Sequence, residues 1–291
     1  MLPLTVVTVV QDILGPTEGE QFALSSIPHS TAAPTHTDLD VTVLALDEIQ
    51  QRVTLQVTGY HVCQPACSWN DRVRLFSLIH TPQQQELPPS ASITLPPSLD
   101  AVSQTVQLPL RGLPLRFPFD QYELRLGITL ERVHADNTVE PLPPAEAPSH
   151  LFVTVQERLP EHVMDAPVSL DPQTVQTPSA PFPYVYVAAL RFHRLLYVQV
   201  LAVLLVLLVT AAAAYAVFLR PFQDLIISAG GLILGIWGIR GILTPASVRY
   251  VTAVDLSLAV VIIFLLGAIT LRALGFFYQR SELPVPRLFR K

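Results

Sequence analysis

The sequence is poor in cysteine, and its first two thirds lack lysine. The 291 residues include two cysteines, Cys63 and Cys67, and two cysteines cannot form the disulfide framework of a small secreted domain. Residues 1–190 contain 8 arginines and 20 acidic residues, which gives them a formal charge of −12. This acidic balance excludes nucleic acid as a partner, because a phosphate backbone requires a basic surface.

The sequence motifs of common enzymes are also missing. The chain has no nucleophile elbow, no histidine pair at the helical spacing of a zinc site, no glycine loop for phosphate and no dinucleotide fingerprint. The histidines are scattered, and we expect His36 and the pair Glu161–His162 to lie in surface loops. These absences predict a non-enzymatic protein with neither a cofactor nor a metal.

Long apolar runs are confined to the last third of the chain. Residues 191–291 carry a formal charge of +7, so the two parts of the chain suit different surroundings. A bilayer core is crossed by about 20 helical residues. The sequence therefore predicts three transmembrane helices within 191–275, at about 195–219, 222–243 and 250–271, followed by a basic cytoplasmic tail over 276–291.

Arginine and lysine set the expected orientation, because the side of the membrane with more of them is the cytoplasm. The C-terminal side has the larger number: Arg220, Arg272, Arg280, Arg287, Arg290 and Lys291. The opposite side has Arg191, Arg194 and Arg249. We therefore expect a multi-pass protein of the plasma or inner membrane, with its C-terminus in the cytoplasm and residues 1–190 outside.

The N-terminal segment is a poor signal peptide for the export of residues 1–190. It has no basic n-region and reaches Asp12 early. Three alternatives stay open: the start is incomplete, the first span directs the export of what precedes it, or the orientation is reversed.

Charged residues inside the predicted spans are symmetric about the loop between the second and third spans. Arg240 and Asp255 are equidistant from the centre of that loop, and Asp224 and Arg272 are equidistant from it to within one residue. Because charges in a membrane are costly and normally paired, we expect two ion pairs, Arg240–Asp255 and Asp224–Arg272. Such pairs either fix the register of the helices or take part in the movement of ions or protons.

Small residues in the spans point to close helix packing. The second span has Gly231 and Gly235 at the spacing that lets two helices approach closely. The first span has a run of alanines over 211–214. Both fit either a compact bundle within one chain or an interface between subunits.

The pattern of the acidic part of the chain, residues 1–190, predicts a β-sandwich. In residues 121–132, apolar residues from Tyr122 to Leu130 alternate with polar ones that include Thr129 and Glu131, which is the period of a half-buried strand. Further strands are expected at 4–10, 41–46, 52–60, 73–79, 92–95, 102–110, 151–157 and 184–190. Short strands separated by Pro-rich and Ser-rich turns are typical of an all-β sandwich over residues 1–190.

The two cysteines lie close together in the sequence, next to a histidine. His61, Cys63 and Cys67 could be three metal ligands, but zinc sites of four protein ligands usually have two close pairs. A disulfide between Cys63 and Cys67 is favoured if the domain is exported, and free thiols are the remaining alternative.

The most distinctive string is a proline turn ahead of the strand at 121–132. Proline marks a strand entry or a turn, so Pro118 predicts one here. We expect Phe117 and Phe119 to hold the turn in the core. Asp120 is expected either to cap nearby backbone N–H groups or to pair with an arginine, and Tyr122 to face the core.

The string Phe117-Pro118-Phe119-Asp120 resembles the turn of pentameric ligand-gated ion channels that couples their extracellular domain to the pore. The strands at 41–46 and 52–60 and the string from Trp69 to Leu75 occur in the same order as early strands of that family. This resemblance implies an immunoglobulin-like, channel-ectodomain-like sandwich. The chain differs in its three predicted spans instead of four, and in a second span without a hydroxyl-lined face.

A second resemblance covers the whole chain. The string Pro118-Phe119-Asp120-Gln121-Tyr122, followed by Arg240, Pro245 and Asp255, is similar to a family of uncharacterised bacterial membrane proteins that join a β domain to C-terminal transmembrane helices. It implies the same architecture and no particular activity.

Together these patterns predict an integral membrane protein whose outer β domain serves binding, sensing or assembly of a membrane complex. Its expected partners are the lipid bilayer and further membrane-protein subunits, of its own kind or another. The alternative is a channel-like oligomeric subunit that is gated through the turn at 117–120.

Overall fold

A computed structural model describes residues 20–25, 33–64, 67–78, 89–143, 146–172, 183–243 and 251–281. The chain divides into two compact units. The first contains residues 1–114 and 119–195, and the second contains residues 115–118 and 196–291. The predicted strand at 4–10 and residues 282–291 of the predicted tail lie outside the described part of the chain.

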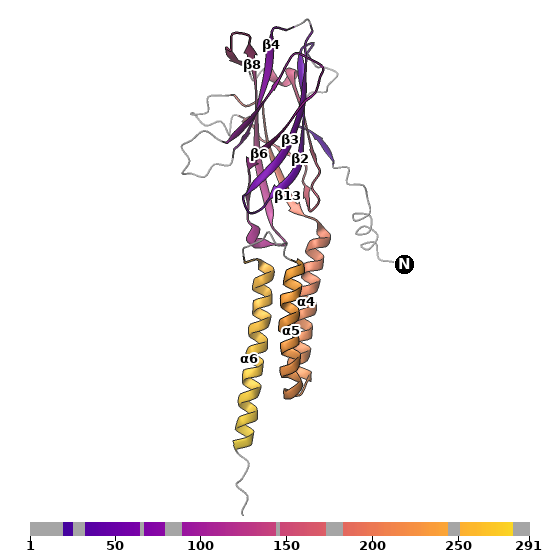
Figure 1. Cartoon of the computed structure of the whole chain (residues 1–291), viewed down its shortest axis with the longest axis vertical. Helices are drawn as coiled ribbons and strands as arrows, with labels where there is room; N and C mark the ends of the chain where they lie inside the picture. The colour runs from indigo at the N-terminus through magenta and orange to yellow at the C-terminus, as the bar shows by residue number, and fades with distance from the viewer. Residues whose placement is uncertain are drawn as a thin grey trace, which may run out of the picture. The chain divides into compact units, whose positions relative to one another are not determined.

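The first unit is built from two β-sheets (Figure 1). One has the strand order β1-β10-β2-β3-β6, and its members are β1 (Gln21–Ala23), β2 (His36–Asp47), β3 (Arg52–Val62), β6 (Val102–Pro109) and β10 (Leu151–Glu157). The other has the main order β11-β13-β8-β4-β5, and its members are β4 (Trp69–Ser77), β5 (Ser90–Leu95), β8 (Gln121–His134), β11 (His162–Met164) and β13 (Tyr186–Arg194). β7 (Arg111–Gly112) and β9 (Val139–Pro141) pair with β8, and β12 (Val168–Ser169) pairs with β13.

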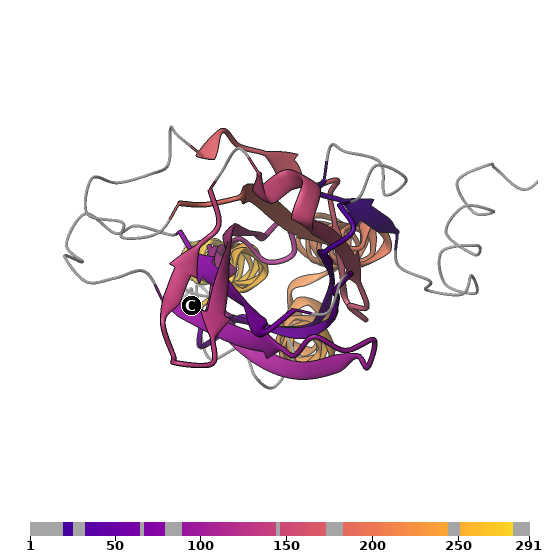
Figure 2. The same cartoon turned by 90° about the horizontal axis from the view of Figure 1, so that it is seen from above.

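Most neighbouring strands run antiparallel, and β10 and β2 form a parallel pair. Two short helices are η2 (Pro114–Arg116) and α2 (Ala147–His150). Residues of both sheets contribute to one apolar core, in which Val41, Leu55, Val73, Leu126 and Leu190 are fully buried. Figure 2, which looks along the β domain, shows its strands surrounding that interior.

The predicted period of β8 is confirmed at its apolar positions. Tyr122, Leu124, Leu126, Ile128 and Leu130 are all buried in the core. The prediction for the opposite face was wrong at the C-terminal end of the strand, where Thr129 and Glu131 are buried too. Glu131 is tolerated there because Arg72 and Arg74 of β4 neutralise its carboxylate, with nitrogen atoms 3.8 and 3.2 Å from Oε2.

Three helices make up the described part of the second unit, and they contact one another. They are α4 (Leu196–Leu219), α5 (Phe222–Leu243) and α6 (Ala253–Ser281). All three were predicted as helices, and α6 continues ten residues beyond the predicted end at 271. A buried apolar cluster joins them, with Ala213, Leu225, Ile236 and Leu265 at its centre.

Two of the three predicted spans, α4 and α6, are confirmed as helices that are long and apolar enough to cross a membrane. Within α5, the apolar stretch of the described residues is Asp224–Gly238.

Candidate functional site

A buried ionic cluster lies where β13 ends. Nε of Arg194, the last residue of β13, donates to Asp120 Oδ1 at 2.9 Å, and its Nη2 donates to Glu48 Oε1 at 2.5 Å. Nη1 lies 3.5 Å from Glu161 Oε2. Arg194 is 2% exposed and Asp120 is fully buried, so this arginine serves three acidic side chains largely away from water.

Four separate parts of the β domain bring the cluster together. Glu48 lies in the turn between β2 and β3, where the side chain of Asp47 accepts hydrogen bonds from two backbone N–H groups and shapes the turn. Asp120 immediately precedes β8, and His162 opens β11, whose register places it opposite Arg194. The ring of Tyr122 packs edge-on against the ring of His162, with their centroids 5.7 Å apart.

Burial shifts the ionisation of the groups around Arg194. It raises the pKa of Glu48, an effect that the charge of Asp120 reinforces and Arg194 opposes. It lowers the pKa of His162 from 6.5 to about 4, and the positive charge of Arg194 adds to this. Burial also raises the pKa of Tyr122, assisted by Asp120. At neutral pH the imidazole of His162 is therefore neutral, and one guanidinium serves the carboxyl groups of Glu48 and Asp120.

The carboxylates of Glu48 and Asp120 lie close enough to His162 for the three to hold a metal ion. The guanidinium of Arg194 already hydrogen-bonds to both carboxylates, and its positive charge opposes a second cation at the same point. The donor set is thus better matched to arginine than to a metal.

The side chains of the turn at 117–120 lie in different surroundings, and the sequence did not predict this arrangement. Phe117 is buried in the apolar cluster of the helices, not in the core of the β domain. The expectation that Phe119 is buried was wrong, since this side chain is 52% exposed. Pro118 is buried, and Asp120 takes the second of its two expected roles by pairing with an arginine.

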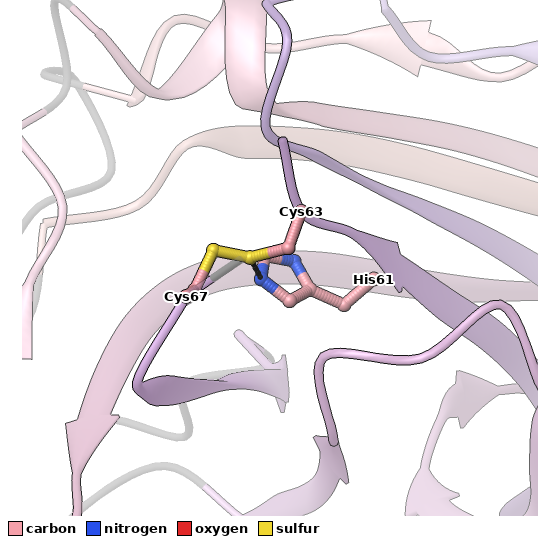
Figure 3. A group of neighbouring side chains, drawn as sticks. All are labelled: His61, Cys63 and Cys67. Atoms are coloured by element: carbon pink, nitrogen blue, oxygen red, sulfur yellow. Dashed lines mark hydrogen bonds between the residues drawn. A yellow bond between two sulfur atoms is a disulfide. The ribbon is translucent and has the colours of Figure 1, made fainter. Parts of the chain in front are cut away.

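A second buried polar group lies at the other end of β3, around His61 (Figure 3). Cys63 and Cys67 are joined by a disulfide, with Cα atoms 5.8 Å apart. Nε2 of His61 lies 3.1 Å from Cys63 Sγ, and its Nδ1 lies 2.9 Å from Asp71 Oδ2. Thr37 donates to the same oxygen at 2.6 Å. These contacts link β2 and β3 of one sheet to β4 of the other.

Of the two expected ion pairs in the helices, Arg240–Asp255 is formed, with Nε and Oδ1 2.7 Å apart. Asp255 also accepts from the backbone N–H and the hydroxyl of Thr252, and Thr252 accepts from the backbone N–H of Asp255. This reciprocal arrangement is a capping box at the start of α6. The ion pair therefore joins the last turn of α5 to the first turn of α6.

The other expected pair, Asp224–Arg272, does not appear among the ion pairs of the described residues. Nη1 of Arg272 donates instead to the backbone oxygen of Arg220, at 2.5 Å. That oxygen follows the last turn of α4, where unsatisfied carbonyls attract cations. Asp224 lies in the first turn of α5, where the helix dipole already favours a negative charge.

The small residues of α4 and those of α5 differ in what packs around them. Ala213 and Ala216 of α4 are buried among the helices. A side-chain carbon added at Gly231, Gly235 or Gly238 of α5 meets no described atom within 4 Å. The alanines thus serve packing within one chain, whereas the glycine face of α5 is uncovered by the described residues.

Sequence reasoning missed the main members of the ionic cluster. Arg194 was expected to flank a membrane helix, and His162 was expected on the surface, but both are buried. His36 also lies within a strand, β2, and not in a loop. The capping box was readable, because Thr252 and Asp255 have its spacing. No protein-family model matches the chain, and no curated protein is significantly similar to it.

Proposed function

We propose that the chain is a non-enzymatic integral membrane protein whose β domain lies outside the cytoplasm and passes a binding or sensing event to the helices. The observation that carries the proposal is the position of the Arg194–Asp120 pair. Residues 115–118 group with the helices, and Asp120 lies two residues after them. Arg194 lies two residues before the start of α4.

The course of the chain limits how such an event can travel. The chain passes between the two units three times, at 114/115, 118/119 and 195/196. The last two passages follow directly after Pro118 and Leu195, and the Arg194–Asp120 pair ties together the two strands beside them. A displacement of β8 relative to β13 therefore pulls on two covalent connections at once.

Membrane insertion is supported by the surfaces of α4 and α6. Large apolar side chains on both helices are exposed, among them Leu207, Phe218, Ile263 and Leu271. Such extensive apolar surface is stable in lipid or against a partner, and not in water. We propose that α5 inserts with its neighbours as a third span, with Asp224 and Arg240 at its ends.

The charge bias supports the proposed orientation. Arg194 is neutralised within the β domain by Asp120 and Glu48, which leaves fewer free cations on that side of the helices. Trypsin should therefore remove the basic C-terminal residues from inverted membrane vesicles and leave them intact in right-side-out vesicles. Cleavage of the tail in right-side-out vesicles alone contradicts the orientation.

The coupling is testable because each unit has one tryptophan, Trp69 on β4 and Trp237 on α5. In a Trp69→Phe background, quenching of Trp237 by brominated lipid reports on the helices. We expect Asp120→Asn to change this quenching, and Glu123→Gln, a matched change at a partly exposed carboxylate, to leave it unchanged. Identical quenching in Asp120→Asn and its parent, with a destabilised β domain, removes the coupling role.

A channel-like oligomer is the second candidate, and the uncovered glycine face of α5 favours it. Glycines at this spacing allow close contact between helices, and the described residues of the same chain do not use them. The mass of the detergent-solubilised particle distinguishes the two candidates. A pentamer supports the channel, and a particle that Gly235→Leu converts from oligomer to monomer assigns the interface to this face. A monomeric wild-type particle excludes the channel.

A further inference from the structure

The disulfide end of β3 gathers three side chains that bind soft metals. Residues two apart in a strand point to the same face, so His61 and Cys63 share one face of the chain at the end of β3 (Figure 3). Cys67 follows Cys63 by four residues in the sequence, and the two sulfurs and a ring nitrogen of His61 all lie within 4.8 Å of one another. This grouping lies at the opposite end of β3 from the ionic cluster around Arg194.

The ring of His61 is held in one orientation. It is buried, and Asp71 from the other sheet faces its Nδ1 at 2.9 Å. A carboxylate at this nitrogen favours the tautomer that carries the proton on Nδ1. Nε2 then presents its lone pair to Cys63 Sγ, 3.1 Å away.

That lone pair has no proton to accept while the disulfide is intact, because a disulfide sulfur carries no hydrogen. A metal-binding histidine typically donates its second ring N–H to a carboxylate, which orients the ring and increases the basicity of the coordinating nitrogen. Asp71 occupies the place of that carboxylate, and Thr37 hydrogen-bonds to the same oxygen and holds it there.

We propose that, when the disulfide is reduced, Cys63, Cys67 and His61 Nε2 form a three-ligand site for a soft cation, Zn(II) or Cu(I). Thiolate and imidazole ligands select these ions. With metal–sulfur bonds of ~2.3 Å and metal–nitrogen bonds of ~2.0 Å, the ligand atoms stand ~3.5–3.8 Å apart in a tetrahedral site. The three ligand atoms already lie within 4.8 Å of one another. Reduction breaks the bond between the two sulfurs, and rotation of the two cysteine side chains then separates them to this spacing.

The disulfide and the metal site exclude each other. A dithiol reductant transfers two electrons and two protons to the disulfide, which yields two cysteine thiols and the oxidised reductant. The cation then displaces one proton from each thiol and binds the two thiolates and the neutral imidazole. A disulfide oxidant then accepts two electrons from the two thiolates and takes up two protons to become a dithiol, which forms the Cys63–Cys67 disulfide again and releases the cation.

The test uses the full-length protein in detergent, with and without treatment by a phosphine reductant that is then removed anaerobically. Zn(II) and Cu(I) are titrated separately in competition with a chromophoric chelator, and proton release is measured with a pH indicator. We expect the reduced protein to bind one equivalent of at least one of the two ions, with about two protons released per ion. The unreduced protein should bind neither ion at this site.

Variants distinguish a site in which His61 and Asp71 contribute to metal binding from binding by the two reduced cysteines alone. Cys67→Ser, at a partly exposed position, should abolish binding, and Asp71→Asn should weaken it by roughly 10–100-fold. His61→Gln should weaken it further, whereas His134→Gln, a matched change at a partly exposed histidine outside this site, should leave it unchanged. Near-ultraviolet circular dichroism checks that each variant is folded.

Three results overturn the proposal. The first is a reduced wild-type protein that binds neither ion. The second is a folded His61→Gln variant with wild-type affinity, because the imidazole is then not a ligand. The third is equal binding before and after reduction, because the cysteines then play no part.

Discussion

Removal of the charge of Arg194 should destabilise the β domain more than removal of the charge of Asp120, although the two side chains form one ion pair. In Arg194→Met, the buried carboxylate of Asp120 loses its cation, and Glu48 and Glu161 stay nearby with the same sign of charge. In Asp120→Asn, the guanidinium keeps Glu48 at 2.5 Å and Glu161 at 3.5 Å.

The magnitudes follow from this asymmetry. Breaking a buried ion pair so that one charge is left uncompensated costs ~3–5 kcal/mol, which we expect for Arg194→Met. Losing one charge-assisted hydrogen bond while the partner keeps others costs ~1.5–3 kcal/mol, which we expect for Asp120→Asn. The double variant should cost less than the sum, because each single change includes the loss of the same contact.

Urea unfolding of the full-length protein in detergent measures these differences. In a Trp237→Phe background, the fluorescence of Trp69 follows the β domain alone. Arg125→Met is the matched control, because Arg125 pairs with Glu123 on the exposed surface and such a pair contributes less than ~1 kcal/mol. An Asp120→Asn variant as unstable as Arg194→Met, or less stable, would refute the sharing of one guanidinium by three carboxylates.

Three further predictions concern other parts of the chain. His162 has a pKa of about 4 when folded against an ordinary 6.5, so the unfolded chain takes up this proton first as the pH falls. The free energy of unfolding should therefore drop by up to ~3 kcal/mol between pH 6.5 and 4, and a His162→Gln variant whose pH profile has the wild-type slope contradicts this. In the helices, Asp255→Ala should lower the melting temperature more than Arg240→Leu, because only the former also removes a capping box worth ~1 kcal/mol; an equal effect means that the cap is unimportant. Replacing both Cys63 and Cys67 by serine should cost ~2 kcal/mol, the loop entropy of so short a closure, and an unchanged urea midpoint argues against a disulfide in the folded protein.

The sequence predicted the elements of this chain better than their contacts. The alternation in β8 and the long apolar runs of α4 and α6 are local patterns, and each is sufficient to identify its element. Arg194 and Glu48 are 146 residues apart in the chain, and Arg194 and Asp120 are 74 apart. No local pattern connects them, and β11, which brings His162 to the cluster, has only three residues.

The prediction at Asp224 and Arg272 failed for a different physical reason. Symmetry about a hairpin loop places two side chains at the same depth, but it does not consider other acceptors at that depth. The carbonyl groups at the end of α4 are such acceptors, and one of them binds Arg272. Arg240 has a suitable acid in Asp255, whose position is fixed by its capping role, and there the symmetry argument found a formed pair.

The β domain thus has two polar centres that respond to different chemistry. Its strand β3 has 11 residues, so the cysteine end and the Glu48 end stand ~33 Å apart at ~3.3 Å per residue. Charges at this distance are screened, with a Debye length of ~8 Å in physiological salt, and side chains so far apart share no contacts. A redox or metal event at Cys63 can therefore reach Arg194 only through a movement of the strands that join the two ends. The β2–β3 hairpin is one such connection, because Thr37 and His61 lie at one end of it and Glu48 lies in the turn at the other. Strands β4 and β8 are another, because Asp71 pairs with Arg132 of β8 and Asp120 immediately precedes β8.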